Sequence, residues 1–306
     1  VNIVAIIIVL LITWMLSFGM TSSVRVNNIA IAIKIAIIVA FIVVGAFFIK
    51  KANYQPFLPY GMHGVFKGAT TVFFAFLGFD CISSSAAEVK NPQKNMPIGI
   101  IGTLLVAAVL YMGVSIVLTG MVKYTKLDVA NPVAFALQAV HQDWLAALLS
   151  IGALIGMATM MFTMIYSSSR LIYSISRDGL LPSFLNKLDA KTSTPKISLW
   201  IVAAIIAVMG GLVSLDRLTD LVNIGTLLAF TLVSFGIIPL RKRKDIGNQG
   251  GFRVPWFPVL PIISGCACLF MMSFLSLDTW IGAGIWFLIG LALYFGYGYR
   301  HSKLAT

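Results

Sequence analysis

Residues 73–85 decide the fold, and they read Phe73-Phe74-Ala75-Phe76-Leu77-Gly78-Phe79-Asp80-Cys81-Ile82-Ser83-Ser84-Ser85. Gly78 relaxes a helix, and an Asp followed by serines is typical of a helix N-cap. The stretch therefore predicts two half-helices with a break near Gly78. Such a break exposes carbonyls that suit a cation such as an ammonium, and N–H groups that suit an anion. The alternative is a kinked helix with Asp80 as its cap and no ligand.

The break lies in one of about nine apolar stretches that are long enough, or nearly so, for a helix to cross a bilayer. Of the 306 residues 59% are hydrophobic and 10% are charged, whereas a soluble domain is about 45–50% apolar and 25% charged. The sequence therefore predicts an all-α polytopic membrane protein. The expected spans are Asn2–Phe18, Asn28–Phe48, Lys67–Ala87, Pro97–Met121, Trp144–Tyr173, Ile197–Ser214, Leu218–Leu240, Phe257–Ser276 and Thr279–Tyr299.

The distribution of positive charge predicts the orientation of these spans. The chain has 22 Lys and Arg residues against 10 Asp and Glu. One set of alternate loops holds 15 of the 22, and cytoplasmic loops carry such an excess, so this side and the C-terminus are expected to be cytoplasmic. The run from Arg241 to Lys244 is then a topology anchor, compatible with anionic lipid, rather than a nucleic-acid patch. The 15 are Arg25, Lys90, Lys94, Arg170, Arg177, Lys187, Lys191, Lys196, Arg241, Lys242, Arg243, Lys244, Arg253, Arg300 and Lys303, and the opposite side holds Lys50, Lys51, Lys67, Lys123, Lys126 and Arg217.

Lys34 lies inside the second expected span. A charge at the centre of a span costs about 2.5–3.5 kcal/mol on insertion scales, so such a residue indicates function by default. Desolvation favours the neutral form of an amine, and Lys34 could therefore release and take up a proton during a functional cycle. The alternative is a lysine that snorkels to the cytoplasmic surface, about 9 Å away along the helix.

Two other patterns accompany the spans. Small and polar residues follow one face of the fifth span, which favours close helix packing, with the lining of a cavity as the alternative. They are Gly152, Gly156, Thr159, Thr163 and Ser167. The outer loop contains Asn131-Pro132, which predicts a short helix that is a candidate lid, with a plain surface helix as the alternative. The stretch Ser176–Pro182 predicts a helix end followed by a turn.

The sequence offers little for catalysis. It has no phosphate-binding glycine loop, and His63, His141 and His301 lie far apart at the edges of spans. Cys266 and Cys268 point to different faces of one helix, so a metal site is not expected. Discontinuous helices form the sites of many secondary transporters. A transporter is therefore favoured over a membrane enzyme acting on lipid-linked substrates, and over a non-transporting sensor or partner subunit.

Three ordered groups of residues carry a resemblance to a known family. The first is Phe74–Asp80 with Glu88-Val89-Lys90-Asn91-Pro92-Gln93 and Pro97-Ile98-Gly99-Ile100. The second is Ser167–Arg170 with Arg177–Pro182, and the third is Val26-Asn27-Asn28 with Lys34. The first group resembles the sixth span of the amino acid–polyamine–organocation superfamily. The second resembles its eighth span and the loop after it, and the third resembles its fifth span. It is most similar to bacterial members that are like cationic amino acid transporters.

The resemblance implies a fold of twelve spans, formed by two inverted repeats of five and two further spans. On that scheme residues 1–306 form a single transmembrane transporter domain that holds spans four to twelve. Residues 1–49 end the first repeat, 66–241 form the second repeat, and 255–299 form the two C-terminal spans. The chain begins at Val1 without Met, and we interpret it as truncated, with cleavage to a mature protein as the alternative. The first broken helix, with its groups for the substrate carboxylate, is then outside it.

The resemblance also implies roles for particular residues. Backbone carbonyls near Phe74, Ala75 and Leu77, beside Gly78, would hold the α-ammonium of the substrate, and Phe79 or Phe74 would act as an aromatic gate. Lys34 would take the place of a sodium ion found in related transporters and couple transport to protons, with Thr159 beside it. Glu88, Arg170 and Arg177 would form part of a cytoplasmic gate.

The function implied by the resemblance is secondary active transport of amino acids across the plasma membrane by proton-coupled symport. The expected partners are an amino acid substrate and membrane lipid, with no nucleic acid. The proton is the coupling ion and no other cofactor is expected. The side-chain preference and the oligomeric state stay open.

Overall fold

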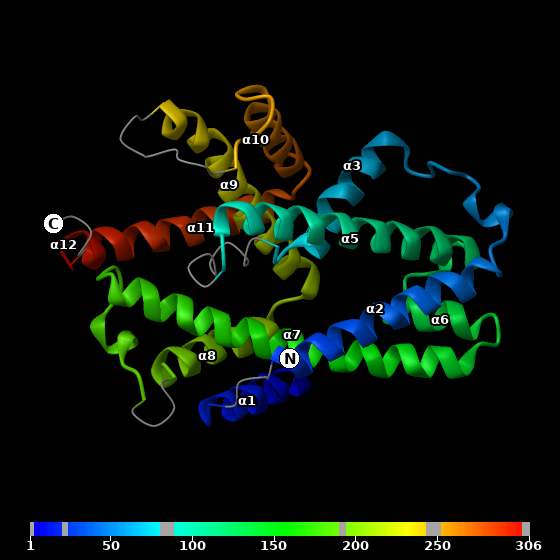
Figure 1. The fold of residues 1–306 in the computed structure, drawn as a ribbon, viewed down its shortest axis with the longest axis horizontal. Coiled ribbons are helices and arrows are strands. Elements are labelled where there is room, and N and C mark those ends of the chain that lie inside the picture. Colours follow the sequence, from blue (N-terminus) through cyan, green and yellow to red (C-terminus); the bar gives the residue numbers. More distant parts are fainter. Residues whose placement is uncertain (1–2, 20–23, 80–88, 190–193, 243–251, 302–306) are drawn as a thin grey trace. The chain divides into compact units, whose positions relative to one another are not determined.

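The computed structural model describes residues 3–19, 24–79, 89–189, 194–242 and 252–301. Every regular element within these ranges is helical (Figure 1), which agrees with the all-α prediction. The longer helices are α1 (Ile3–Ser17), α2 (Val24–Ala46), α3 (Gly61–Val72), α5 (Pro92–Met121), α7 (Asp143–Arg177), α8 (Lys196–Leu212), α9 (Leu215–Lys242), α10 (Val259–Met272) and α11 (Leu277–Leu293). The shorter elements are α6 (Pro132–Gln138), α12 (Tyr299–His301), the 3₁₀ turns η1 (Lys51–Tyr54), η2 (Phe73–Phe76), η4 (Tyr124–Lys126) and η5 (Ser183–Asn186), and the π-helical turn η6 (Tyr294–Gly298).

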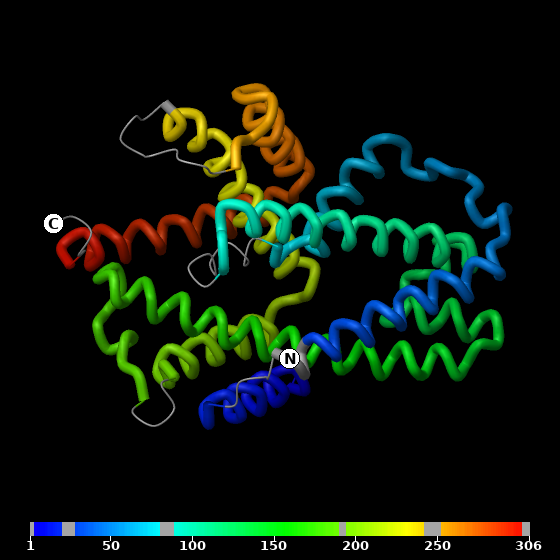
Figure 2. The backbone as a smooth tube through the Cα atoms, in the orientation of Figure 1, coloured from blue at the N-terminus to red at the C-terminus, as the bar shows by residue number. Residues whose placement is uncertain are grey.

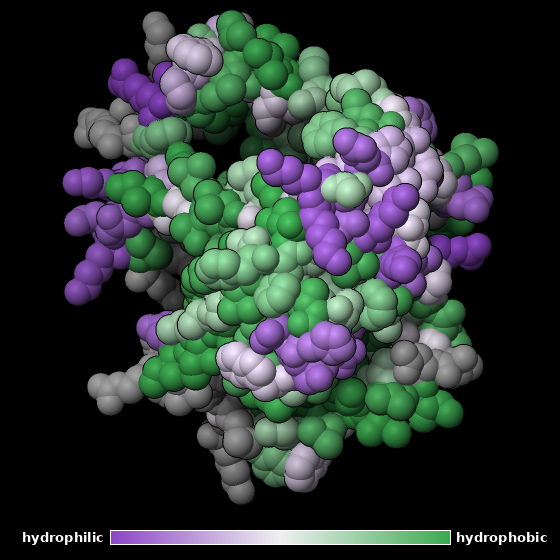
Figure 3. Space-filling model, turned by 90° about the vertical axis from the view of Figure 1, so that its right-hand side faces the viewer, coloured by the Kyte–Doolittle hydropathy of each residue, from purple (hydrophilic) through white to green (hydrophobic). Residues whose placement is uncertain are grey.

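Within the described ranges, five segments are helical, long and apolar enough to cross a membrane: Asn28–Ala46, Pro92–Met121, Asp143–Arg177, Leu215–Arg241 and Leu277–His301. The shorter apolar helices α1, α8 and α10 coincide with three more of the expected spans. Large apolar side chains on these helices are exposed, as Val109 (64%) and Leu154 (63%) illustrate, and Figure 3 shows apolar surface over much of one face. Such surface suits contact with lipid. The expected span Lys67–Ala87 runs into residues outside the described ranges, so the total of nine stays a prediction.

Contacts divide the chain into two compact units, which we describe separately. The first unit comprises residues 1–44, 129–218 and 284–306. Its core lies where α1 packs against α7 and α8 (Figure 1), and small residues on α8 allow the close approach. A Cβ on Gly211 of α8 would lie 2.7 Å from a terminal carbon of Ile6, so a larger residue there would push α1 away. The buried cluster consists of Val9, Ile12, Leu16, Ile165, Leu199, Ala203 and Ala207.

The second unit comprises residues 45–128 and 219–283. Its core contains Ile224 and Leu227 of α9 and Met272 of α10, with Phe73 of η2 packed against them. The turn η1 is fastened to the end of α5, because the Asn53 amide donates to the carbonyls of Gly120 (2.7 Å) and Met121 (3.1 Å). The boundaries of the two units differ from the repeats implied by the resemblance, and the division into repeats stays a prediction.

Two local predictions are confirmed at the ends of helices. The Asn131 side chain caps α6 by accepting a hydrogen bond from the backbone N–H of Ala134 at 3.3 Å, directly before Pro132. Helix α7 ends at Arg177, and Gly179 then turns the chain with a φ of +86°. A role of α6 as a lid stays a prediction.

Candidate functional site

The chain leaves the helical conformation between α3 and Gly78. Helix α3 ends at Val72, the turn η2 follows, Leu77 is extended (φ −63°, ψ 145°), and Gly78 has a φ of +109°. Side chains with a Cβ rarely adopt that φ, so glycine is required for the chain to turn here. The predicted break near Gly78 is thus present. The predicted second half-helix and its cap Asp80 fall on residues 80–88, which lie outside the described ranges.

Two of the three carbonyls expected to bind the amine, those of Phe74 and Ala75, already have donors. The Phe74 carbonyl accepts from the backbone N–H of Leu77 at 3.2 Å. The Ala75 carbonyl accepts from the hydroxyl of Tyr111, on α5, at 2.9 Å. A carbonyl oxygen has two lone pairs, so each can still accept a bond from a bound ammonium. Tyr111 was not predicted, although it is the one tyrosine in α5 and its phenol is a usable signal.

The aromatic residues at the break pack against α9. The ring of Phe230 lies 6.1 Å from that of Phe73 and 5.4 Å from that of Phe79, measured between centroids. Phe74 is instead 42% exposed. The choice of Phe79 or Phe74 as the gate stays a prediction. Phe230 was also missed, because nothing in its span distinguishes it from a packing residue.

A buried amide supports the helix that leads to the break. Asn223 of α9 is fully buried, and its Nδ2 donates to the Thr70 carbonyl of α3 at 3.1 Å. The Thr70 hydroxyl in turn lies 3.1 Å from the Phe66 carbonyl and 3.3 Å from the Met271 carbonyl of α10. The Asn223 Oδ1 has no hydrogen-bond partner among the described residues. Asn223 and Thr70 together join α3 to both α9 and α10.

Lys34 and Thr159 are brought together in the first unit, where α2 meets α7 (Figure 2). The Lys34 Nζ donates to the Thr159 Oγ1 at 2.8 Å. The Thr159 hydroxyl lies 3.0 Å from the Ile155 carbonyl and 2.9 Å from the Gly156 carbonyl, so its hydrogen is directed at its own helix. Its lone pairs are therefore available to Lys34. Within the described part of the chain Lys34 forms no ion pair, and its role in proton coupling stays a prediction.

The small residues of α7 make room for α2. A Cβ on Gly156 would lie 3.3 Å from the Cε of Lys34, and a Cβ on Gly152 would lie 2.7 Å from the Cδ1 of Ile37. At this depth the stripe of small residues therefore serves helix packing, which was the favoured interpretation. The absence of a side chain at Gly156 also leaves room for the aliphatic part of the Lys34 side chain.

The residues of the predicted cytoplasmic gate have local contacts. The Arg170 guanidinium lies 5.0 Å from the centre of the Tyr166 ring, one turn earlier on α7. The Arg177 Nε lies 3.9 Å from the Asp178 carboxylate, and both side chains are exposed. Glu88 lies outside the described ranges. The gate stays a prediction, to which these contacts add no support.

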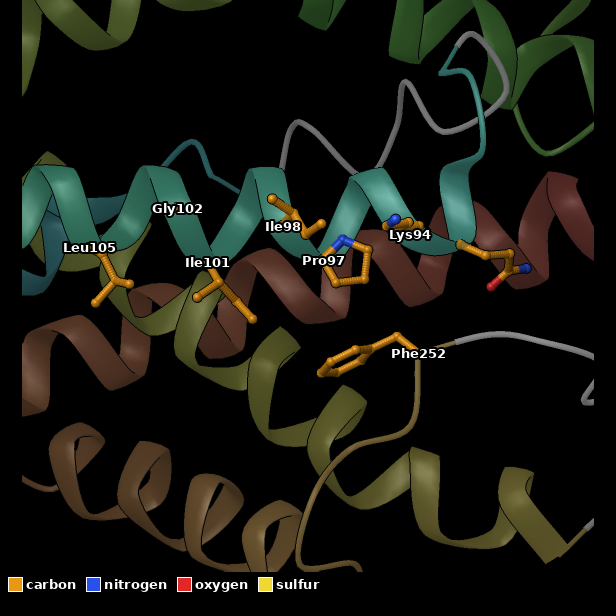
Figure 4. Close-up of a pocket in the computed structure, with 8 residues that line it drawn as sticks. Lys94, Pro97, Ile98, Ile101, Gly102, Leu105 and Phe252 are labelled. Atoms are coloured by element: carbon orange, nitrogen blue, oxygen red, sulfur yellow. The ribbon is translucent and has the colours of Figure 1, made fainter.

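A groove of about 680 Å³ runs along the first part of α5. Figure 4 shows Phe252 lying opposite Pro97 and Ile101 across it. Apart from Gln93 and Lys94 at one end, the lining is apolar, which suits a lipid chain better than a polar substrate. The groove is lined by Gln93, Lys94, Pro97, Ile98, Ile101, Gly102, Leu105 and Phe252, none of which belongs to the predicted substrate-binding set.

Known proteins match the chain along most of its length. It is 48% identical over 303 residues to the methylthioribose transporter of Bacillus subtilis (strain 168), covering 99% of this chain and 66% of that protein. It is 44% identical over 305 residues to the branched-chain amino acid permease BcaP of the same organism, and the match covers 99% of this chain and 65% of that protein. It is 35% identical over 296 residues to the chloroplastic cationic amino acid transporter 9 of Arabidopsis thaliana, covering 96% and 50%.

The chain thus spans about two thirds of the length of the first two of these relatives. The family model described as "Amino acid permease" matches residues 1–299. This match confirms the resemblance and the preference for a transporter over an enzyme. The family match and the candidate spans together identify the chain as a multi-pass membrane protein. The chain belongs to the amino acid permease family.

Proposed function

We propose that the protein is a secondary transporter that carries α-amino acids across the plasma membrane. The observation that carries this proposal is the break between Val72 and Gly78, where the α-helix stops at the residues whose carbonyls, those of Phe74, Ala75 and Leu77, we assign to the amine. Carbonyl oxygens suit an ammonium group, and non-helical backbone at membrane depth is tolerated where it lines a protein or water-filled cavity. Phe79, beside Gly78, is proposed as the aromatic gate, with Phe74 as the alternative.

Proton coupling through Lys34 is part of the same proposal. The amine is tied to Thr159 on another helix, and no carboxylate in the described residues neutralises it. A charged side chain within the membrane costs free energy, so its presence there indicates a function. Release of the proton would weaken the bond to Thr159, because hydrogen bonds from a charged donor are about twice as strong as neutral ones.

The architecture completes the proposal. Residues 1–306 form one transmembrane domain with inverted repeats, expected spans four to twelve and a cytoplasmic C-terminus. The excess of Lys and Arg on one set of loops supports this orientation. Glu88, Arg170 and Arg177 remain the proposed cytoplasmic gate.

Methylthioribose is a second candidate substrate, favoured by the 48% identity to a methylthioribose transporter. This sugar has hydroxyl groups and a thioether but no amine. Its hydroxyl groups, in place of an ammonium, would therefore donate hydrogen bonds to the carbonyls at the break.

Uptake into proteoliposomes made with the whole natural protein tests the proposal. Labelled leucine, lysine and methylthioribose are supplied with and without an inward proton gradient. We expect amino acid uptake that rises with the gradient. Uptake of methylthioribose alone would favour the second candidate. Uptake without gradient dependence would remove the coupling role of Lys34. Binding without uptake would favour a sensor or partner subunit.

A further inference from the structure

Tyr111 contacts the broken helix with both its ring and its hydroxyl. The ring meets that of Phe76 nearly edge-on, with centroids 5.1 Å apart and an interplanar angle of 69°. The hydroxyl donates to the Ala75 carbonyl at 2.9 Å. Ala75 and Phe76 are neighbours in η2, directly before the extended Leu77 and Gly78. One side chain of α5 therefore fixes two adjacent residues of this turn.

The backbone of this short turn orients its own carbonyls weakly. A 3₁₀ turn of four residues has poorer hydrogen-bond geometry than an α-helix, and the glycine that follows removes the support of a continuing helix. The Phe74 carbonyl is held within its own segment by the N–H of Leu77. The Ala75 carbonyl is instead held from outside, by Tyr111. Its direction thus depends on a residue 36 positions away in the sequence.

The direction of the Ala75 carbonyl matters for an amine. A donor binds best near the lone-pair directions of a carbonyl oxygen, and the bond weakens steeply when it is misaligned. The Tyr111 hydroxyl uses one lone pair and leaves the second for an N–H of the ammonium.

We propose that Tyr111 is a positioning residue that holds the Ala75 carbonyl in the direction the substrate's α-amine requires. The residue thereby favours substrates that carry an amine over those that lack one. This inference rests on the proposed function, in which the carbonyls at the break bind that amine. Tyr111 acts through Ala75.

The variant Tyr111→Phe tests the proposal, with Tyr54→Phe as a matched control. The Tyr54 hydroxyl also donates to a backbone carbonyl of α5, that of Ile116, at 2.8 Å. Each variant therefore loses one hydroxyl–carbonyl bond and keeps its ring. The affinity of the whole natural protein is measured for leucine and for isocaproate, which is leucine without its amine. We expect Tyr111→Phe to weaken leucine binding about threefold to tenfold, the effect of one hydrogen bond. Isocaproate binding, and both affinities of Tyr54→Phe, should be unchanged.

A purely structural role for Tyr111 predicts a different pattern. An equal loss of affinity for leucine and isocaproate, or an unchanged or increased affinity for leucine, would overturn the proposal. Phe76→Leu removes the ring contact and keeps the hydroxyl, and it should retain the preference for leucine. Loss of that preference would assign the effect to ring packing. A wild-type protein that binds no amino acid would overturn the proposed function before any variant is compared.

Discussion

Lys34 is the residue proposed to couple transport to protons. The variant Lys34→Met keeps an unbranched side chain of similar volume and removes the donor to Thr159. We expect it to abolish uptake of labelled amino acids driven by a pH gradient, because no other titratable amine lies in that span. Lys123→Met, at an exposed position after α5, is the control and should transport normally. Undiminished, still proton-driven uptake by Lys34→Met would remove this role.

Gly156 sets the space available to Lys34. In Gly156→Ala the new methyl group would lie 3.3 Å from the Lys34 Cε, so the flexible lysine must shift by a few tenths of an ångström. We expect the fold to persist and the rate of proton-driven uptake to fall. Gly210→Ala, where a Cβ meets nothing within 4 Å, should transport normally and gain up to about 1 kcal/mol of helix stability. Thermal melting in detergent and uptake in proteoliposomes are the measurements. Equal uptake by both variants would contradict the steric argument.

At the scale of the element, the break depends on Gly78. Leucine at this position would have to adopt a φ of +109°, which costs of the order of 1–3 kcal/mol or moves the turn. We therefore expect Gly78→Leu to weaken substrate binding strongly. Gly290→Leu in α11, where a Cβ would meet nothing within 4 Å, should leave binding intact. Equal effects of the two substitutions on affinity would show that Gly78 is only a packing residue.

The position of α3 depends on Asn223. Replacement by alanine removes the bond to the Thr70 carbonyl and leaves a small cavity in a fully buried place. We expect Asn223→Ala to lower stability by about 1–3 kcal/mol and to weaken substrate binding as well. Thr226→Ala is the control, because the Thr226 hydroxyl bonds only to the Val222 carbonyl of its own helix at 2.9 Å. A wild-type melting temperature for Asn223→Ala would refute this role.

At the scale of the whole molecule, the charge asymmetry predicts which loops face the cytoplasm. Single cysteines are placed at Lys51 and at Lys187 in a protein whose own three cysteines have been replaced. A membrane-impermeant maleimide applied to intact cells should label the first position and not the second. The opposite pattern would invert the proposed topology, and labelling of both would contradict the assignment of the spans between them.

Features that depend on residues close together in the chain could be predicted from the sequence, whereas contacts between distant segments could not. The apolar stretches, the turn after Arg177 and the break at Gly78 each depend on local propensity, so their own residues reveal them. The bond from Tyr111 to Ala75 and that from Asn223 to Thr70 depend on how separate helices pack. Lys34 and Thr159 were paired in advance only through the resemblance to a known family.

The uninterrupted course of α7 has a mechanical consequence. The helix continues from Asp143 to Arg177 in one piece, so the contact at Thr159 and the turn after Arg177 belong to the same rod. From Thr159 to Arg177 the helix rises about 27 Å, so a tilt of about 10° at Thr159 would carry its end through about 5 Å. A small change in the bond to Lys34 would therefore be amplified with distance along the rod. If Lys34 gains and loses a proton as proposed, helix α7 would act as a lever arm that converts this change into a displacement large enough to move a loop.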